Sequence, residues 1–277
     1  LWASGGHRFS VTMSLGLMTA GLAIKSGLFP FHLWMPDTYG QATPASSGIL
    51  SGVVSKGYIV FLIKVIYQVI GIDVFAATGI QTVLLLFGIG GMIAGSVSAI
   101  FARRLTTMIA FSSAAQIGYI YMGLGMGTQA ALAAVLFQIV SHALTKPMLF
   151  LSGADRAAAH RDPTAGCVFT VGALSMVGIP IFAGFIPKLY FAAAAFHMGW
   201  RTWAVLLALA LSTLLNVLYF LYTTLLLWVP EAETEHTRRL RWVSVPGLVF
   251  VALNIAVGLR SYGLMDLFRQ GMDLFCQ

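Results

Sequence analysis

Charged residues are scarce in this chain: they make up 9% of its 277 residues, while 58% are hydrophobic and the mean hydropathy is +0.87. A soluble domain carries about 25% charged residues, so this composition excludes an ordinary soluble protein and indicates one that lies in a bilayer. Since one spanning helix needs about 20 apolar residues, the length accommodates about eight spans.

Other signals are missing as well. The two cysteines, Cys167 and Cys276, are far apart and have no His or Cys neighbour at ligand spacing, so neither a disulfide framework nor a metal site is expected. The net charge of +7 comes without a long basic run or interleaved aromatic residues, so nucleic acid is not an expected partner. The chain also lacks nucleotide-binding motifs and a signal peptide. We therefore expect the chain itself to bind no cofactor.

Carboxylates are absent from the middle of every apolar stretch. All nine lie in loops or near helix ends, at Asp37, Asp73, Asp155, Asp162, Glu231, Glu233, Glu235, Asp266 and Asp273. A buried cation in this chain must therefore find its counter-charge in water, in another subunit or in a part of the protein outside these residues.

Apolar runs, in contrast, fill the chain. They are bounded by glycine, proline or charge and lie at 11–29, 48–70, 79–101, 106–125, 129–152, 166–191, 203–229 and 243–261. They predict an all-α, polytopic membrane protein with about eight transmembrane helices. Prolines and glycines predict discontinuous helices near residues 25–36 and 178–188, because a proline removes a backbone donor and the freed carbonyls need a packed or hydrated neighbour.

The two kinds of basic residue are distributed differently. All eleven arginines lie in loops or at helix ends, and seven of them share the side of the loops after the first, third, fifth and seventh spans, which is expected to be cytoplasmic. All five lysines fall within apolar runs, at Lys25, Lys56, Lys64, Lys146 and Lys188. A charge at mid-bilayer costs about 2.5 to 3.5 kcal/mol, so these lysines indicate a function. A buried lysine, unlike arginine, can release its proton.

Two histidines extend this pattern. His142 lies four residues before Lys146, so both side chains project from one helix face, and a neutral imidazole can accept the lysine's proton. His32, at the break in the first apolar run, is a candidate gate. The alternative for His142 is a hydrogen-bonded position in the core.

The lysines have structural alternatives too. Lys64 stands near the end of its helix and is expected to snorkel to the headgroups, which is also the alternative for Lys188. For Lys25 and Lys56 the alternative is a structural hydrogen bond to a backbone carbonyl.

Residues 25–64, KSGLFPFHLWMPDTYGQATPASSGILSGVVSKGYIVFLIK, resemble the antiporter-like subunits of respiratory complex I and the large subunits of Mrp-type cation/proton antiporters. The shared pattern is a lysine, then Pro-Phe-His-x-Trp, then Pro-Asp, and then a helix with Lys-x-Gly-x-Tyr. The segments 112–125, 141–154 and 169–190 resemble the same family, in the same order.

The resemblance implies roles for individual residues. Lys25 would be the lysine of the family's seventh helix, which pairs with a glutamate on the fifth. Lys56 would pass protons toward His142 and Lys146, and Lys188 would be the exit residue on the broken twelfth helix. By the same resemblance residues 1–262 are the C-terminal portion of a proton-conducting domain of fourteen helices, with 263–277 as a tail and about six helices before Leu1.

The expected function is that of a proton-translocating subunit of a multi-subunit complex, coupled to NADH:quinone or related oxidoreduction. It would be a transport subunit without its own redox site, with NADH, quinone, flavin and Fe–S groups on partner subunits. The alternative is a subunit of an Mrp-type Na+/H+ antiporter. A second alternative is a transporter of an organic substrate or an inactive structural subunit. The expected surroundings are other membrane subunits and the lipid of the bacterial cytoplasmic membrane.

Overall fold

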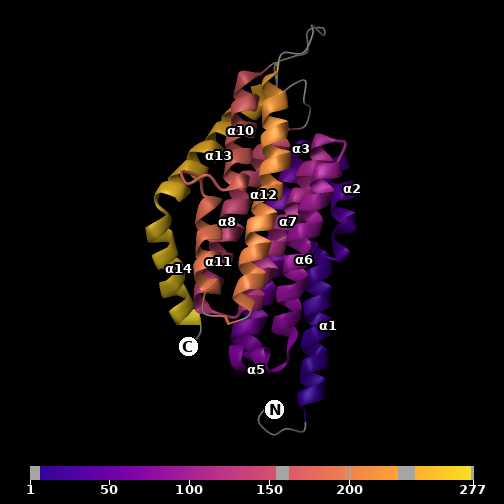
Figure 1. Ribbon diagram of the computed structural model, residues 1–277, viewed down its shortest axis with the longest axis vertical. Coiled ribbons are helices and arrows are strands. Elements are labelled where there is room, and N and C mark those ends of the chain that lie inside the picture. Colours follow the sequence, from indigo (N-terminus) through magenta and orange to yellow (C-terminus); the bar gives the residue numbers. More distant parts are fainter. Residues whose placement is uncertain (1–6, 154–161, 197, 200, 230–240, 276–277) are drawn as a thin grey trace.

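The computed structural model shows a bundle of helices (Figure 1). It describes residues 7–153, 162–196, 198–199, 201–229 and 241–275. These ranges contain no strand, which confirms the predicted all-α fold. Some residues used in the sequence predictions lie outside the described part: Cys276, the loop arginines Arg156, Arg161, Arg238 and Arg239, and the carboxylates Asp155, Glu231, Glu233 and Glu235.

The first part of the chain forms two interrupted helices and a short connecting helix. The elements are α1 (Arg8–Ser26), the 3₁₀ turn η1 (Phe31–Leu33), α2 (Trp34–Gln41), α3 (Pro44–Ile49), the π-helical turn η2 (Leu50–Val54), α4 (Ser55–Lys64), the π-helical turn η3 (Val65–Ile70) and α5 (Ile72–Ala77). Long helices follow: α6 (Ile80–Phe101), α7 (Leu105–Met126), α8 (Gln129–Ser152), α10 (Pro163–Val177), α11 (Phe185–Ala195), α12 (Arg201–Trp228), α13 (Arg241–Leu259) and α14 (Ser261–Phe275).

Several of these helices can cross a membrane. Among the described residues, five stretches are long and apolar enough: Arg8–Gln41, Pro44–Ile70, Ile80–Phe101, Gln129–Ser152 and Arg201–Trp228. The pair α13–α14, which is bent by 74°, is a sixth candidate. Of the other two predicted spans, one is α7, which is as long as α6 but carries more polar residues, and the other is the short apolar pair α10 and α11. The protein is therefore a multi-pass membrane protein, as predicted.

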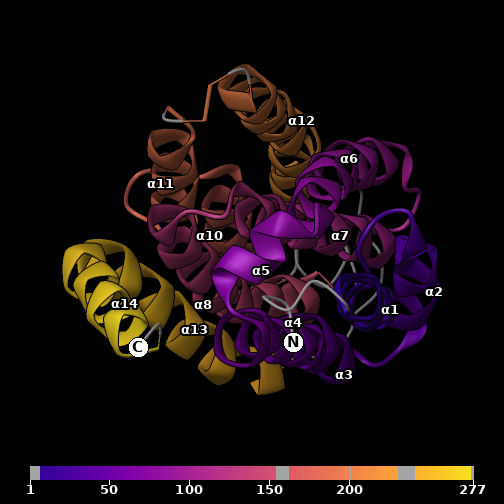
Figure 2. The same ribbon diagram turned by 90° about the horizontal axis from the view of Figure 1, so that it is seen from below.

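The centre of the bundle is formed by α7 and α8. Seen along the bundle, α7 and α8 lie inside, with α6 and α12 on one side, α1 to α4 on another, and α13 and α14 at the edge (Figure 2). Eighteen of the 22 residues of α7 are buried, and its polar side chains therefore face protein. This explains why α7 is less apolar than the peripheral helices.

Helices α6 and α7 pack against each other at very short range. They are antiparallel, because Gly95 lies against Ala115 and Gly125 against Leu85. A Cβ on Gly118 would stand 2.4 Å from the backbone nitrogen of Met92. Membrane helices use such small residues for close approach, where dispersion contacts and not hydrophobic burial drive association.

Both predicted helix breaks are present. After α1 the chain turns through Gly27, whose φ is 83°, and resumes at η1 and α2. After α10 it turns through Gly178, whose φ is 95°, and resumes at α11. These two left-handed positions favour glycine because a Cβ is strained there.

The expected domain boundary at residue 262 falls within α14, so the segment predicted as a tail is helical up to Phe275.

Candidate functional site

The predicted site residues divide into an interior group and a peripheral group. Lys56, His142 and Lys146 are at most 3% exposed, and Lys188 is half-buried. Lys25, in contrast, is exposed at the last turn of α1. The interior group comes from three separate parts of the bundle: η2–α4, α8 and α11.

Lys56 stands directly after a π-helical turn. In this turn the Ser55 N–H donates to Leu50, five residues back. The carbonyl of Ser51 accepts hydrogen bonds from the Lys56 ammonium and from the Ser55 hydroxyl, the latter at 3.1 Å. Lys56 also donates to the Ser55 hydroxyl at 3.1 Å. π turns in α-helices occur frequently at functional sites, and here the turn directs a carbonyl and a hydroxyl to the buried ammonium.

Lys146 is held by α7. Its ammonium donates to the carbonyl of Ile109 at 2.9 Å and to the hydroxyl of Ser112 at 2.5 Å. The same carbonyl accepts a hydrogen bond from Ser113 at 3.0 Å. All these partners are neutral, so the charged form of Lys146 is stabilised by dipoles alone.

A hydrogen bond between two serines joins the surroundings of the two lysines. The hydroxyls of Ser51 and Ser113 lie 2.8 Å apart and join η2 to α7. Ser51 carries the carbonyl that receives Lys56, while Ser113 donates to the carbonyl that receives Lys146. Two serines therefore connect the two buried ammonium groups across the helix interface.

His142 lies one helical turn before Lys146 on α8 and directly before Ala143, whose carbonyl faces Gly52 of the Lys56 segment. It is 1% exposed, and neither of its ring nitrogens has a hydrogen-bond partner among the described residues. A histidine that only serves the core would be hydrogen-bonded, so the structural alternative is not supported. The free nitrogens leave His142 available to accept or donate a proton.

Two glycines and a proline bring these elements together. A Cβ on Gly48 would lie 3.2 Å from Pro147, and one on Gly52 would lie 3.3 Å from the carbonyl of Ala143. Pro147, inside α8, lacks the N–H that this carbonyl would receive from a residue four positions later. The glycines therefore let the Lys56 segment reach α8 at Ala143 and Pro147, the residues that follow His142 and Lys146.

A second polar cluster leads from α8 to the broken helix. Asn254, on α13, donates to the hydroxyl of Thr145 at 2.9 Å and to that of Ser175 at 3.2 Å. Ser175, on α10, in turn accepts from the N–H of Gly184 in the break at 3.3 Å. Thr145 precedes Lys146, so this cluster connects the lysine's helix with the break.

Lys188 caps the broken end of α10. Its ammonium donates to the carbonyls of Met176 at 3.0 Å and Val177 at 2.7 Å, and it lies 5.6 Å from the centre of the Tyr119 ring. The carbonyl of Met176 has no helical donor because Pro180, four residues later, has no N–H. The break thus creates the lysine's site, and Lys188 is not a headgroup anchor.

Lys25 and His32 lie apart from Lys56, His142, Lys146 and Lys188. The Lys25 ammonium is 5.8 Å from the ring of Tyr58 and lines a surface recess that also contains Ser55, the partner of Lys56. The predicted acidic partner of Lys25 stays a prediction. His32 is buried between the rings of Phe29 and Phe111, with centroids at 5.7 and 6.4 Å, and its nitrogens have no partner among the described residues.

Sequence reasoning missed the neutral partners. These are polar residues on the helices that carry or face the lysines: Ser51, Ser55, Ser112, Ser113, Thr145, Ser175 and Asn254. The signal was present, since a helix face that gathers hydroxyls within an apolar run points to the bundle interior. Within the described part of the chain, no group of three His, Cys, Asp or Glu is placed to hold a metal ion.

Known proteins are similar to this chain in sequence. The family described as NADH:quinone oxidoreductase/Mrp antiporter, TM, matches residues 4–215. NADH-quinone oxidoreductase subunit N of Desulforudis audaxviator is 34% identical over 226 residues, which is 76% of this chain and 44% of that protein. The chain spans about half the length of the curated relatives it matches.

Solved structures agree with this match. The Mrp complex of Dietzia sp. contains a chain with a TM-score of 0.81 and 22% identity, covering 97% of this chain and 60% of that one, which shows the shared fold. Respiratory complex I of Thermus thermophilus contains one with a TM-score of 0.70 and 25% identity, covering 92% and 58%. The chain belongs to the transmembrane family of NADH:quinone oxidoreductase and Mrp antiporter subunits.

Proposed function

We propose that this chain is part of a membrane subunit that translocates protons through Lys56, His142, Lys146 and Lys188. The observation that carries the proposal is the Ser51–Ser113 hydrogen bond, which joins the residue whose carbonyl binds Lys56 to the residue that donates to the carbonyl that binds Lys146. Two buried ammonium groups that have only neutral partners are unfavourable when both are charged, because like charges repel each other in a medium of low dielectric.

The neutral partners suit lysines that alternate between charged and uncharged states. A carboxylate beside each lysine would hold the proton permanently, whereas hydroxyls and carbonyls stabilise an ammonium less strongly. Protonation of Lys56 would then favour release from Lys146 by repulsion, with His142 as the intermediate acceptor. The polar cluster around Asn254 and the helix break at Lys188 form the proposed exit route for the proton.

The surrounding complex supplies the energy. The curated relatives are NADH-quinone oxidoreductase subunits, which favours a redox-driven complex in a bacterial cytoplasmic membrane. NADH, quinone, flavin and Fe–S groups would belong to partner subunits. The fold is equally that of an Mrp complex chain, so exchange of Na+ for protons is the second candidate.

The decisive measurement is proton uptake by vesicles that contain the complete, assembled complex. Lys146→Met and Lys56→Met each keep much of the side-chain volume and remove the proton site. Uptake should fall by about tenfold or more in each variant, since a positioned proton-transfer group typically contributes about a hundredfold or more.

The controls separate the candidates. Normal uptake in both variants, with normal assembly, would contradict the proton relay and favour a structural subunit. Uptake driven by NADH without sodium would identify the redox complex. Uptake that appears only when a sodium gradient is imposed would identify the antiporter.

A further inference from the structure

Helices α13 and α14 carry an arginine at the bend between them. The stretches Val245–Leu259 and Ser261–Met272 are apolar enough to cross the membrane together as one span bent by 74°, and Arg260 lies between the two halves. Figure 1 shows the pair at the edge of the bundle, with the bend well inside the length of the bundle. As one span, the pair therefore places Arg260 within the membrane and not in a loop at its surface.

The bend is packed against the other broken helix. A Cβ on Gly258 would stand 2.3 Å from the carbonyl oxygen of Ile181, and the side-chain oxygen of Asn254 accepts from the Ala183 N–H at 3.3 Å. Ile181 and Ala183 lie in the break between α10 and α11, inside the apolar run 166–191. These contacts hold the backbone of Arg260 at the level of that break.

The Arg260 side chain is exposed, although it lies within the span. Among the described residues its guanidinium has no hydrogen-bond or ion-pair partner. Charged side chains inside a membrane are costly, and they nearly always face the bundle interior or a cavity and pair with an opposite charge or a carbonyl. A group from outside the described chain is therefore needed to cover Arg260.

The rest of α14 is also poorly suited to lipid. Asp266, Arg269 and Gln270 are exposed, and the Gln270 amide donates to Asp266 at 2.9 Å. Helix α12, in contrast, has no charged residue from position 202 to its end at Trp228. The short stem of Asp266 cannot carry its carboxylate to the headgroups as the long stem of an arginine or lysine can. The exposed edge of α14 therefore suits protein better than hydrocarbon.

An apolar groove adjoins the bend. It has a volume of about 360 Å³, and its lining includes Arg260 together with the apolar side chains of Val257, Leu264 and Leu267. Tyr262, two residues after Arg260, is 84% exposed. The groove thus offers apolar walls and one unpaired cation. Apolar side chains of a membrane helix fit such walls, and a carboxylate forms charge-assisted hydrogen bonds with a guanidinium.

We propose that the groove at the α13–α14 bend is the docking site for a transmembrane helix of a partner subunit, and that this helix carries an Asp or Glu carboxylate that pairs with Arg260. Charge complementarity selects this occupant, because a lipid tail has no anion at this depth and a helix with a cation would be repelled. The inference rests on the proposed membership in a larger complex. It does not depend on the proton relay.

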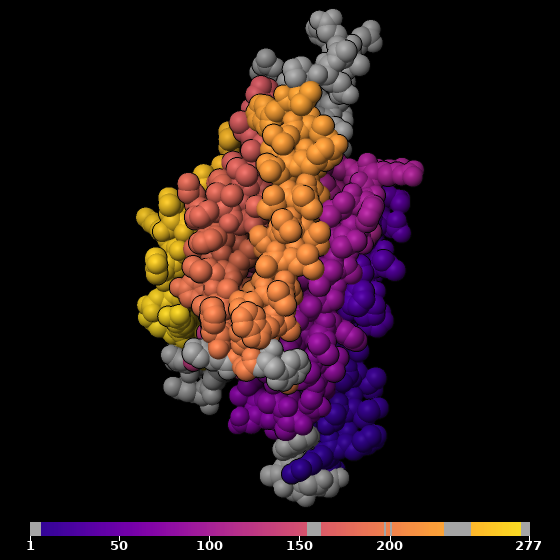
Figure 3. All heavy atoms as spheres, viewed as in Figure 1, coloured from indigo at the N-terminus to yellow at the C-terminus, as the bar shows by residue number. Residues whose placement is uncertain are grey.

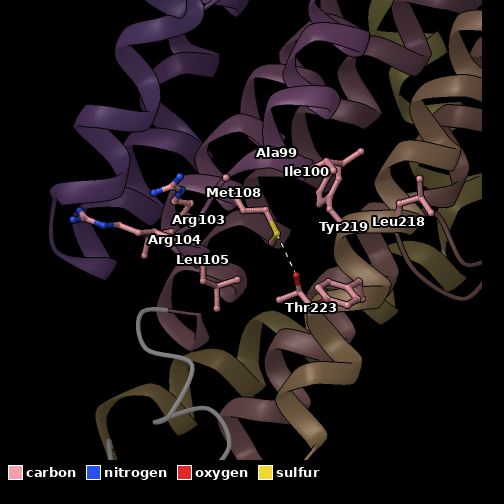
Figure 4. A pocket seen from close by; sticks show the side chains of 12 residues that line it. Ala99, Ile100, Arg103, Arg104, Leu105, Met108, Leu218, Tyr219 and Thr223 are labelled. Atoms are coloured by element: carbon pink, nitrogen blue, oxygen red, sulfur yellow. Dashed lines mark hydrogen bonds between the residues drawn. The ribbon is translucent and has the colours of Figure 1, made fainter.

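Arg103 and Arg104 provide the matched controls. They are exposed at the α6–α7 turn, at the edge of a pocket of about 730 Å³ between this turn and α12 (Figure 4). Figure 4 shows both side chains directed away from the pocket. These arginines lie at the end of two helices, where headgroups and water reach a charge, so they need no protein partner.

The stability of the complete complex tests the charge of Arg260. Arg260→Leu should insert normally, because it makes the span more apolar. Its complex should then dissociate about tenfold faster or more in mild detergent, since truncating one member of a buried charge pair weakens an interface by at least that factor. Arg260→Lys should recover part of this loss, and Arg104→Leu should dissociate at the unchanged rate. Copurification of the partner subunits with a tag on this subunit, followed over time, measures the rates.

Photocrosslinking identifies the occupant of the groove. Benzoylphenylalanine in place of Tyr262, in the intact purified complex, should join this subunit to another membrane subunit at a peptide that has a carboxylate within an apolar stretch. The same group in place of Tyr222 on α12, which is 64% exposed, should give no protein adduct, because that side faces lipid. Arg260→Glu should lose the partner, and replacing the partner's carboxylate by an arginine should restore it.

The outcomes keep this inference apart from the relay. If Arg260→Leu dissociates no faster than Arg104→Leu, no anion pairs with Arg260 and the inference is wrong. An adduct within this subunit, an adduct with lipid alone, or a partner peptide without a carboxylate overturns it as well. If Lys146→Met pumps normally while Arg260→Leu falls apart, the relay fails and the docking site stands.

Discussion

At the scale of single residues, Lys56 and Lys64 show how one helix can place the same side chain in two environments. Lys56 is 3% exposed and bonded to Ser51 and Ser55. Lys64, eight residues later, is exposed at the end of α4. The long apolar stem of an exposed lysine near a helix end reaches along the lipid to the headgroups.

This difference makes Lys64 a matched control for the relay. We expect Lys64→Gln to keep proton uptake near that of the unchanged complex, because its charge faces the periphery. Uptake by vesicles with Lys64→Gln, Lys56→Gln and the unchanged complex, at equal subunit content, checks this. A large loss for Lys64→Gln would show that Lys64 is a member of the relay and that its assignment as an anchor is wrong.

At the scale of helices, interruptions create the site. There are three such interruptions. The π turn before Lys56 shifts the pattern of backbone hydrogen bonds. Pro147 in α8 and the break before Lys188 each leave a carbonyl without its usual helical donor. In lipid such groups need new partners, and at the first and last of these places a lysine supplies one. The helix irregularities and the buried charges therefore explain each other.

The contact between α6 and α7 holds this arrangement, and Gly118 is one of its close approaches. Gly118→Ala would place a methyl group 2.4 Å from the Met92 backbone nitrogen, which no rotamer can relieve. We expect a loss of about 1 to 3 kcal/mol in stability, as for other overpacked interiors. Thermal unfolding of the purified complex, followed by the intact fraction in size-exclusion chromatography, measures it.

Gly263→Ala on α14 is the control for this substitution. A Cβ there would meet nothing within 4 Å. Because alanine favours a helix over glycine by roughly 0.5 to 1 kcal/mol, this variant should be as stable as the unchanged protein or slightly more so. Equal losses for both glycines would mean that the α6–α7 contact is looser than the structure shows.

At the scale of the whole molecule, the exposed face of α12 is apolar and suited to contact with lipid. On the face shown in Figure 3, α12 forms an exposed stripe between the atoms of α10 and α11 on one side and those of α6 on the other. Its outward side chains are large and apolar, for example Trp203 at 70%, Leu207 at 66% and Leu214 at 57% exposure. Such a surface suits hydrocarbon, whereas the polar side chains of α12, Ser212 and Asn216, are buried.

This division predicts how charge is tolerated along α12. Leu214 lies at the middle of the helix, so Leu214→Arg should oppose insertion by about 2.5 to 3.5 kcal/mol. Trp203→Arg, in the first turns, should have little effect because its side chain can snorkel. Membrane insertion of the two variants, measured by protease protection in isolated membranes, compares them. Equal insertion of both would show that Leu214 faces protein or water in the assembled complex.

Much of the fold could be predicted from the sequence. The apolar runs, the two breaks and the segregation of lysines from arginines depend on local composition, because a bilayer requires apolar length and makes a buried charge costly. The family followed from the motif around Lys25 and Lys56. These properties are local, so a sequence displays them without any knowledge of packing.

Tertiary structure decided which groups surround each lysine. Ser113 and Ile109 on α7 and Asn254 on α13 are far from the lysines in sequence, and only the packing of α7, α8 and α13 brings them to the relay. The π turn at η2 was likewise hidden; its Gly52 lies against Pro147 of α8. The sequence determined that buried lysines exist and where helices break. The contacts between helices determined which lysines are connected, because proton transfer depends on distances of a few ångströms between segments that the chain keeps far apart.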